Sequence, residues 1–264
     1  MVDFVAAPTD GSRQFRMSRP VRLADAAPDG RMRPDAVARL LQDVASDDWA
    51  DTGVTSEDTW LVRRTALRLR AGGRWPTLGD MVTATTWCGG SGAAWAERRT
   101  DLAIGGETVL ETVALWVPVG RSGMPVRVGV EFYSAYGPSA RRRVTSRTPT
   151  HPVPPEASRR RWSVRWADLD VVGHANNAAL WTPLSELAPA GIRSASVTYV
   201  GGVEYGDSLD LVHDQGRWWL VVDDVVRVAG TYDLEGTGGS ARREDATDQD
   251  QRETEHDAEG ERLA

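Results

Sequence analysis

The stretch VRWADLDVVGHANNAALWTPLSELA, residues 164–188, has an earlier counterpart in VRLADAAPDGRMRPDAVARLLQDVA, residues 21–45. The two stretches align without a gap at an offset of 143 residues and share, numbered in the earlier one, Val21, Arg22, Ala24, Asp25, Gly30, Ala36, Leu41 and Ala45. A match at one constant spacing over 25 residues indicates an internal repeat. We therefore predict that the chain builds the same unit twice.

Each copy is predicted to begin with a strand, continue with a helix and end with several strands. In the first copy, residues 15–23 alternate apolar and polar side chains as a half-buried strand does. A helix should begin at Pro34, which suits the first helical position, and end between residues 49 and 53. Its buried face has the helical spacing i, i+3, i+4, i+7, at Val37, Leu40, Leu41 and Val44.

Glycine pairs divide the rest of the first copy into what reads as an antiparallel meander. Its strands are predicted at residues 61–70, 81–87, 94–102 and 109–119. The second copy is predicted to contain a strand at 162–166, a helix at 177–188 and strands at 194–201, 208–213, 217–223 and 225–231. Pro183 lies inside the predicted second helix, and should kink or break it unless the helix begins later.

Composition divides the chain into five segments. They are a flexible N-terminus (1–14), a first copy without catalytic groups (15–139), an Arg- and Pro-rich linker (140–160), a second copy with catalytic groups (161–234) and an acidic, disordered tail (235–264). The tail is too polar to bury enough surface to offset its ordering entropy. The basic linker is either a solvated connector or a docking strip for an acidic partner, and the sequence leaves both open.

The overall composition argues against several classes of function. Cys88 is the single cysteine, which rules out internal disulfides and thiolate metal clusters and agrees with a reducing compartment. The longest apolar run, near residues 113–119, is too short to cross a bilayer. The histidines are too dispersed to predict a metal site, and an acidic chain without an aromatic RNA-reading motif is a poor nucleic-acid binder. We predict a cytoplasmic protein with no membrane or nucleic-acid partner.

The chemical groups of the repeat are unequally divided between the copies. Both copies keep an aspartate, at Asp25 and Asp168, and a glycine, at Gly30 and Gly173, so these residues are predicted to serve the fold. The second copy alone carries a carboxylate, an imidazole and two amides, at Asp170, His174, Asn176 and Asn177, where the first copy has Ala27, Arg31, Arg33 and Pro34. We predict that this differing set serves a reaction.

Asp170 is the predicted catalytic carboxylate, because it lies on a loop that enters a helix. It can attack a bound carbonyl, or deprotonate a water molecule that attacks it, while backbone N–H groups at the helix start stabilise the oxyanion. His174 would orient Asp170 or the water. One of Asn176 and Asn177 should cap the helix and the other bind substrate. Gly173 permits either close approach of a substrate or a tight turn.

The pattern D-x-D-x-x-G-H-x-N-N at residues 168–177 resembles that of the hotdog-fold thioesterases. Two tandem copies with the pattern in the second are similar to the acyl-ACP thioesterases, over most of residues 15–232. The first copy adds similar segments, a helix with Gln42 and strands at 79–87 and 114–119. The resemblance implies an α+β fold of two tandem hotdog domains, each an antiparallel sheet wrapped around a central helix, paired as a pseudo-dimeric double hotdog.

The resemblance also implies an activity, the hydrolysis of fatty acyl thioesters to free fatty acids, with acyl-ACP as the leading substrate. It implies catalytic Asp170 and His174, an acyl tunnel near the two helices, no metal or organic cofactor, and substrate contacts from Gly173, Asn176, Asn177 and Gln42. The alternatives are an acyl-CoA thioesterase and a catalytically silent protein that binds acyl groups or their carrier. The protein would be a monomeric double hotdog or a homodimer.

Two positions depart from the family pattern. The catalytic asparagine of the family, two residues after the aspartate, is Val172 here. The glutamate or Glu-Cys pair that the family carries on a strand falls at Gly202 and Val203. Glu204 should lie on the same strand face as Gly202, so it is the predicted auxiliary residue. The remaining pair, Asp170 with the imidazole, looks like that of simpler acyl-CoA hotdog thioesterases, which rely on one aspartate and helix N-terminal donors.

Overall fold

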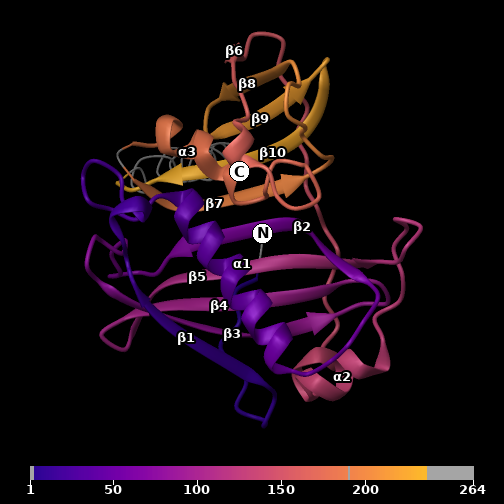
Figure 1. Ribbon diagram of the computed structural model, residues 1–264. Coiled ribbons are helices and arrows are strands. Elements are labelled where there is room, and N and C mark those ends of the chain that lie inside the picture. Colours follow the sequence, from indigo (N-terminus) through magenta and orange to yellow (C-terminus); the bar gives the residue numbers. More distant parts are fainter. Residues whose placement is uncertain (1–2, 190, 237–264) are drawn as a thin grey trace, which may run out of the picture.

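The computed structural model describes residues 3–189 and 191–236 as one large antiparallel sheet with helices against it (Figure 1). The first half contains β1 (Gln14–Pro20), α1 (Pro34–Asp51), β2 (Thr59–Leu69), β3 (Met81–Ser91), β4 (Ala96–Ile104) and β5 (Glu107–Val119). The second half contains β6 (Ser158–Arg161), α3 (Thr182–Leu187), β7 (Ile192–Tyr199), β8 (Leu209–Asp214), β9 (Arg217–Val222) and β10 (Val225–Leu234). Between the halves lies α2 (Val130–Tyr136).

The strand order of the sheet repeats from one half to the other. From one edge the order is β1-β3-β4-β5-β2, and from the other edge it is β6-β8-β9-β10-β7. Each strand of the first half therefore has a counterpart in the second. The halves join where β2 pairs antiparallel with β7, with Ala66 opposite Ser196. This arrangement confirms the predicted fold class, two α+β hotdog units in tandem that together form a double hotdog.

The loop before each helix makes the same backbone hydrogen bonds in both copies. In the first copy the bonds run from Ala27 N–H to Arg31 O at 2.7 Å, from Met32 N–H to Pro76 O at 2.7 Å and from Arg33 N–H to Asp25 O at 2.8 Å. In the second copy they run from Asp170 N–H to His174 O at 2.8 Å, from Ala175 N–H to Val203 O at 2.7 Å and from Asn176 N–H to Asp168 O at 2.8 Å. The internal repeat is therefore confirmed at the level of individual backbone bonds.

The two central helices differ in length. α1 has 18 residues, whereas the second copy has a 3-10 turn at Ala179–Trp181 followed by the six residues of α3. The prediction of a helix from residue 177 is therefore wrong at its start. Pro183 explains the difference, because proline is tolerated in the first turn of an α-helix and lies there in α3.

The segment predicted as a linker, residues 140–160, ends in a strand. β6 pairs with β8 at the edge of the sheet, so the strand predicted at 162–166 is placed too late. The chain before β6 lies against the sheet, where Trp219 donates its indole N–H to His151 O at 2.9 Å. Thr198 likewise donates its hydroxyl to Pro149 O at 3.0 Å. The seven residues of α2, also unpredicted, are too few to show a helical period.

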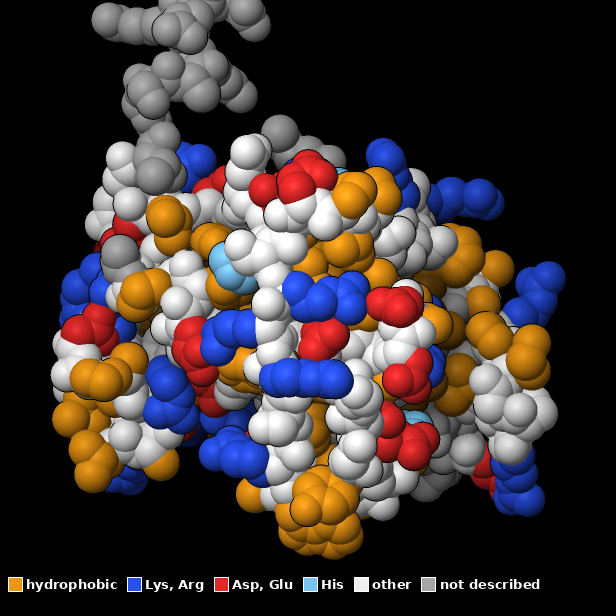
Figure 2. Space-filling model, turned by 90° about the horizontal axis from the view of Figure 1, so that it is seen from above, with side chains coloured by type: hydrophobic (Ala, Val, Ile, Leu, Met, Phe, Trp, Pro, Cys, Tyr) orange, Lys and Arg blue, Asp and Glu red, His pale blue; other side chains and the backbone are white. Residues whose placement is uncertain are grey.

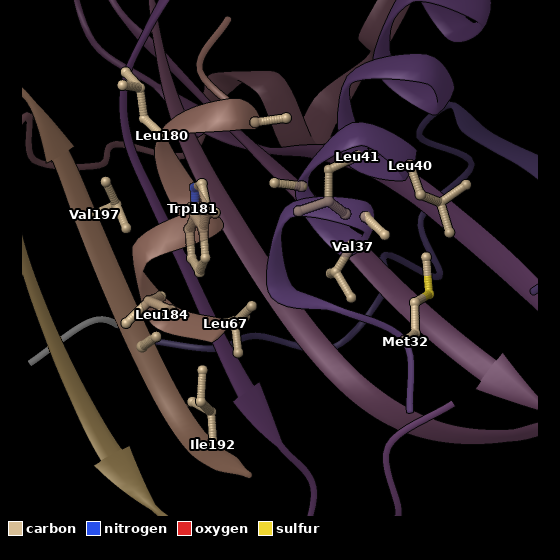
Figure 3. Close-up of a cluster of buried hydrophobic side chains, with 14 of the residues drawn as sticks. Met32, Val37, Leu40, Leu41, Leu67, Leu180, Trp181, Leu184, Ile192 and Val197 are labelled. Carbon is tan, nitrogen blue, oxygen red and sulfur yellow. The ribbon is translucent and has the colours of Figure 1, made fainter. Parts of the chain in front are cut away.

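One hydrophobic core runs through both copies, between the helices and the sheet. Figure 3 shows Trp181 and Leu184 of the second copy beside Leu67 of β2, with Val37 and Leu41 of α1 in the same layer. Trp181 is completely buried, and its indole N–H is paired, because it donates to a tyrosine hydroxyl of β7 at 2.8 Å. Burial of these side chains from both copies in one layer joins the two units into a single packed body.

The N-terminal segment, residues 3–13, has no helix or strand and reaches the first half of the sheet, where the Arg68 guanidinium lies 4.3 Å from the centre of the Phe4 ring. The predicted acidic tail lies outside the described residues except for Glu235 and Gly236. No described helix combines the length and the apolar character of a membrane-spanning segment. On the face shown in Figure 2, basic and acidic side chains are interspersed, so that face presents no continuous basic strip.

Candidate active site

Asp170 lies in the tight turn that precedes the second helix. Its Oδ1 accepts the N–H of Val172 at 2.9 Å, and its carbonyl accepts the N–H of Gly173 at 3.0 Å. Gly173 has a φ of 89°, which explains the glycine by the turn itself. The Asp170 side chain is half-buried, and its Oδ2 has no hydrogen-bond partner within the described residues. The turn therefore fixes the carboxylate and leaves one oxygen for a substrate or a water molecule.

His174 is exposed, and its imidazole lies over the backbone of Gly202. A Cβ at position 202 would meet the ring at 3.2 Å, which is tighter than ordinary contact, so the glycine makes room for the imidazole. The imidazole Nε2 is 3.7 Å from Glu204 Oε1, too far for a hydrogen bond. Residues 200–208 belong to no named strand, but Glu204 forms an isolated antiparallel bridge with His174. The Cβ direction of Gly202 and the Glu204 carboxylate both point toward the His174 ring.

The two asparagine side chains lie in different surroundings. The side-chain oxygen of Asn176 accepts the N–H of Ala178 at 2.8 Å, within the turn that precedes the second helix; the N-cap of the 3-10 turn itself is Ala178. The Asn177 side chain instead lines a narrow cavity together with Gln42 of α1. The backbone N–H of Asn177 has no acceptor within the described residues.

Asp168 serves the fold, as its repeat in both copies predicts. Its carboxylate accepts the backbone N–H of Arg165 at 2.8 Å and the guanidinium of the same residue at 2.6 and 3.0 Å. Burial alone would raise the pKa of Asp168, but these hydrogen bonds outweigh it and leave that pKa below its ordinary value. Asp25 of the first copy accepts the N–H of Arg22 in the same way, at 2.8 Å.

Two adjoining cavities lie between α1 and the first half of the sheet. The narrower has a volume of about 20 Å³ and contains the side chains of Asn177, Gln42 and Val62 in its wall. The wider has a volume of about 330 Å³, and its wall includes Trp49, Trp60, Cys88, Phe132 and Tyr136. Arg98 and Trp116 line both cavities, so the two cavities lie side by side and share part of their walls.

A separate cavity of about 270 Å³ occupies the corresponding place in the other copy, between residues 27–34 and the end of α3. At the offset of the repeat, Ala27 takes the place of Asp170. Pro34, which has no backbone N–H, takes the place of Asn177. The same backbone frame is thus present twice, and one of the two lacks both the carboxylate and the amide donor.

Tyr199 of β7 is a site residue that the sequence does not predict. Its buried hydroxyl accepts the indole N–H of Trp181 at 2.8 Å and donates to the carbonyl of Asn177 at 3.3 Å. Burial raises the pKa of Tyr199 to about 12, so the hydroxyl keeps the proton that it donates. This tyrosine holds the start of the second helix against the narrow cavity. A single tyrosine in a predicted strand gives no signal of this role.

Arg98 of β4 is a second unpredicted residue, and it brings charge into the cavity wall. Its guanidinium donates to Asp48 Oδ2 at 2.5 Å and to the Tyr136 hydroxyl at 2.7 Å. Burial raises the pKa of the Cys88 thiol in the same wall to about 11, which leaves that cysteine protonated and a poor nucleophile. The sequence did contain a signal for a buried arginine, the adjacent pair Arg98 and Arg99 in the predicted strand 94–102. Successive side chains of a strand point to opposite faces of the sheet, so one of the two must face the core.

Two family models match the chain in succession. Residues 12–136 match the acyl-ACP thioesterase N-terminal domain, and residues 153–259 match the acyl-ACP thioesterase C-terminal domain. Among solved structures, the 12:0-ACP thioesterase from Umbellularia californica has a TM-score of 0.70 at 20% identity, covering 83% of this chain and 96% of its own. An acyl-ACP thioesterase from Bacteroides thetaiotaomicron has a TM-score of 0.69 at 15% identity, with coverages of 83% and 96%. No curated protein sequence matches.

Proposed function

Because this chain belongs to the acyl-ACP thioesterase family and is a hydrolase of fatty acyl thioesters, we propose that Asp170 carries out the hydrolysis. The observation that carries the proposal is a fixed carboxylate with one free oxygen, on a loop whose far end lines a cavity under α1. The hydrogen bond from Asn176 N–H to Asp168 O, at 2.8 Å, holds the two ends of that loop together.

Asp170 can act as a base or as a nucleophile. As a base, it takes a proton from a water molecule whose oxygen attacks the thioester carbonyl. The tetrahedral intermediate then collapses, the C–S bond breaks and the sulfur takes up a proton. As a nucleophile, its free oxygen attacks the carbonyl, the C–S bond breaks and the thiolate leaves and takes up a proton; water then hydrolyses the resulting anhydride to the fatty acid and regenerates the carboxylate. On either route the unpaired N–H of Asn177 is the proposed donor to the oxyanion.

His174 is proposed to orient the attacking water rather than the carboxylate. Its imidazole makes no hydrogen bond to Asp170 within the described residues, and it is exposed where water can reach it. The proposed part of Glu204, at 3.7 Å, is to favour one orientation of the ring. The Asn176 side-chain oxygen holds the turn before the helix, and its side-chain NH₂ is proposed to be available to substrate.

The acyl chain is proposed to lie in the two cavities under α1. A helix of 18 residues is long enough to cover both cavities, whereas α3 ends after six residues. Gln42 and Asn177 face the narrow cavity from opposite copies. The catalytic groups of the second copy and the chain-binding surface of the first would then form one site.

The test is thiol release from acyl-ACP by the wild type and by two matched aspartate variants. We expect Asp170→Asn to lose about 10²- to 10⁴-fold in kcat with an unchanged Tm, because it removes the base or nucleophile. Asp168→Asn is the control, and we expect it to lower Tm through its bonds to Arg165. Near wild-type turnover by Asp170→Asn would refute the mechanism.

Acyl-ACP is the proposed substrate over acyl-CoA on the strength of the family match. Faster thiol release from acyl-CoA would favour the alternative substrate. The exposed Val172 and the missing side chain of Gly202 favour a second candidate, a protein that binds the thioester without hydrolysing it. Binding without thiol release would support that candidate. The proposed compartment is the cytoplasm, since the single cysteine suits a reducing environment. The proposed oligomeric state is a monomeric double hotdog, since the two hotdogs already pair within one chain.

A further inference from the structure

Four large apolar side chains are exposed around the turn that holds Asp170. Trp166 and Tyr205 are 74% and 60% exposed. Val171 and Val172, which directly follow Asp170, are fully and 70% exposed. Single exposed apolar side chains are common on protein surfaces, but several at one place often mark a contact with another molecule. We call these four side chains the entrance patch.

The aromatic members of the entrance patch connect the two loops of the proposed site. Trp166 begins the 3-10 turn that precedes Asp170. Tyr205 directly follows Glu204, whose carboxylate lies 3.7 Å from the His174 imidazole. The ring centres of Trp166 and Tyr205 are 5.6 Å apart and their planes meet at 88°, an edge-to-face contact. The patch therefore lies beside the proposed reaction centre and spans both loops.

The fold does not account for the tryptophan. At the offset of the repeat, Leu23 takes the place of Trp166 in the first copy and is 80% exposed, so this position faces away from the core in both copies. Trp162 and Val164, in the same segment, pack against the core, whereas Trp166 does not. A tryptophan at this position adds apolar surface that the described part of the chain leaves open to solvent.

The arginines beside the entrance patch are engaged by neighbouring side chains. Arg165 donates to both carboxylate oxygens of Asp168, at 2.6 and 3.0 Å. Arg161 donates to the hydroxyl of Ser208, in the loop that carries Tyr205, at 2.6 Å. These guanidiniums are poorly placed to receive the phosphate groups of coenzyme A. An apolar centre with a charged rim is instead the composition of a contact between two proteins.

An acyl-ACP substrate brings a protein to the reaction centre, because a pantetheine arm joins its thioester to the carrier. The carrier must then lie within reach of that arm around Asp170. We infer that Trp166 and Tyr205 are specificity-determining residues, which contact the carrier protein and favour an acyl group on that protein over the same group on coenzyme A. The inference rests on the proposed function, because it takes Asp170 as the reaction centre.

The experiment measures kcat/KM for one saturated acyl chain on three carriers, ACP, coenzyme A and free pantetheine. All three contain the same arm, so the ratio of kcat/KM for acyl-ACP to that for acyl-pantetheine isolates the contact with the carrier protein. We expect Trp166→Ala to lower this ratio by about 10- to 100-fold, because a few aromatic residues dominate the binding energy of many protein interfaces. Tyr205→Ala should lower it in the same direction, and it decides alone if Trp166→Ala does not fold.

The matched control is the double variant Leu23→Ala and Leu78→Ala. Leu78 takes the place of Tyr205 in the first copy, because each directly follows the residue that forms an isolated bridge to the loop before the helix. The two leucines are 80% and 49% exposed. The double variant removes apolar surface at the equivalent place in the copy without the catalytic carboxylate, so the ratio should stay at the wild-type value.

A ratio that is unchanged in both Trp166→Ala and Tyr205→Ala would overturn the inference. If the wild type also binds phosphatidylglycerol vesicles and Trp166→Ala does not, that outcome would assign the patch to a lipid surface. A loss confined to acyl-CoA would likewise overturn the inference and assign the rings to the nucleotide. If no thioester is hydrolysed, the proposed function fails, and calorimetric affinities for acyl-ACP still decide the inference. Weaker binding by Trp166→Ala than by the wild type supports it, and equal affinities refute it.

Discussion

Asp48, in the last turn of α1, joins three other parts of the fold through one buried carboxylate. Its Oδ1 accepts Arg13 Nε at 2.7 Å, and its Oδ2 accepts Arg98 Nη1 at 2.5 Å and the Tyr136 hydroxyl at 2.8 Å. The Asp48 side chain is only 1% exposed, and that of Arg98 is 13% exposed. Asp48→Ala would therefore leave a guanidinium inside the protein without its counter-charge.

The size of the effect follows from this burial. Removing one partner of a buried ion pair costs about 3–5 kcal/mol, because the remaining charge stays desolvated. For a chain of this size each kcal/mol lowers Tm by roughly 2–4 °C, so Asp48→Ala should lower Tm by roughly 6–20 °C. The control is Asp51→Ala, which removes the other partner of Arg13. The Asp51 side chain is 60% exposed, and an exposed ion pair contributes about 0–1 kcal/mol.

Urea unfolding followed by circular dichroism, with a thermal scan beside it, measures both variants against the wild type. A loss of less than about 1 kcal/mol for Asp48→Ala, equal to that of Asp51→Ala, would refute the reasoning. The result also bears on the cavity, because Arg98 lines it. A guanidinium released from Asp48 should slow turnover of long saturated chains more than that of short ones.

Three further changes test separate parts of the molecule. Gly202→Ala puts a Cβ 3.2 Å from the His174 ring, so a small displacement of the ring should lower kcat/KM by roughly tenfold and leave Tm unchanged. Unaltered kcat/KM would mean that the ring position is unimportant. Asp101→Asn should raise the free energy of unfolding at pH 8 by about 1 kcal/mol after allowance for solvent screening. Burial, and then the charge of Glu111, raise the pKa of Asp101 to about 6 from 3.8. The ionised Asp101 therefore lowers the free energy of unfolding fully above pH 6 and not at all below pH 3.8. Urea unfolding of the wild type and the variant below pH 3.8 and above pH 6 checks this. Burial raises the pKa of Tyr199 to about 12 from 10.0, so wild-type stability should fall between pH 10 and pH 12, and Tyr199→Phe should show a smaller fall in the same titration.

The sequence predicts the repeated order of strands and helix because both depend on local patterns. Alternating apolar residues identify the strands, and the offset of 143 residues identifies the second copy. The start of the second helix was misplaced although Pro183 carried the warning, because the repeat suggested that both helices begin alike. α2 was missed because a helix of seven residues has too few turns for a period to appear.

The loop with Asp170 and His174 could be found from sequence because its residues are contiguous, and the unlike copy beside it served as an internal comparison. The cavities could not be found in this way. Their walls combine α1, β2, β4 and β5 with the loop of the other copy, and such meetings depend on tertiary packing. Trp116 and Tyr199 acquire their parts only from neighbours that are distant in the chain.

The antiparallel pairing of β2 with β7 takes place within one polypeptide, where a dimer of single hotdogs would need two to meet. Tethering makes that encounter independent of protein concentration, so dilution cannot separate the halves. Two identical subunits must also carry any mutation in duplicate, whereas covalently joined halves can change one at a time. The pairing of β2 with β7 thus allows the two halves to differ, as they do in the residues before each helix and in the length of the helix itself.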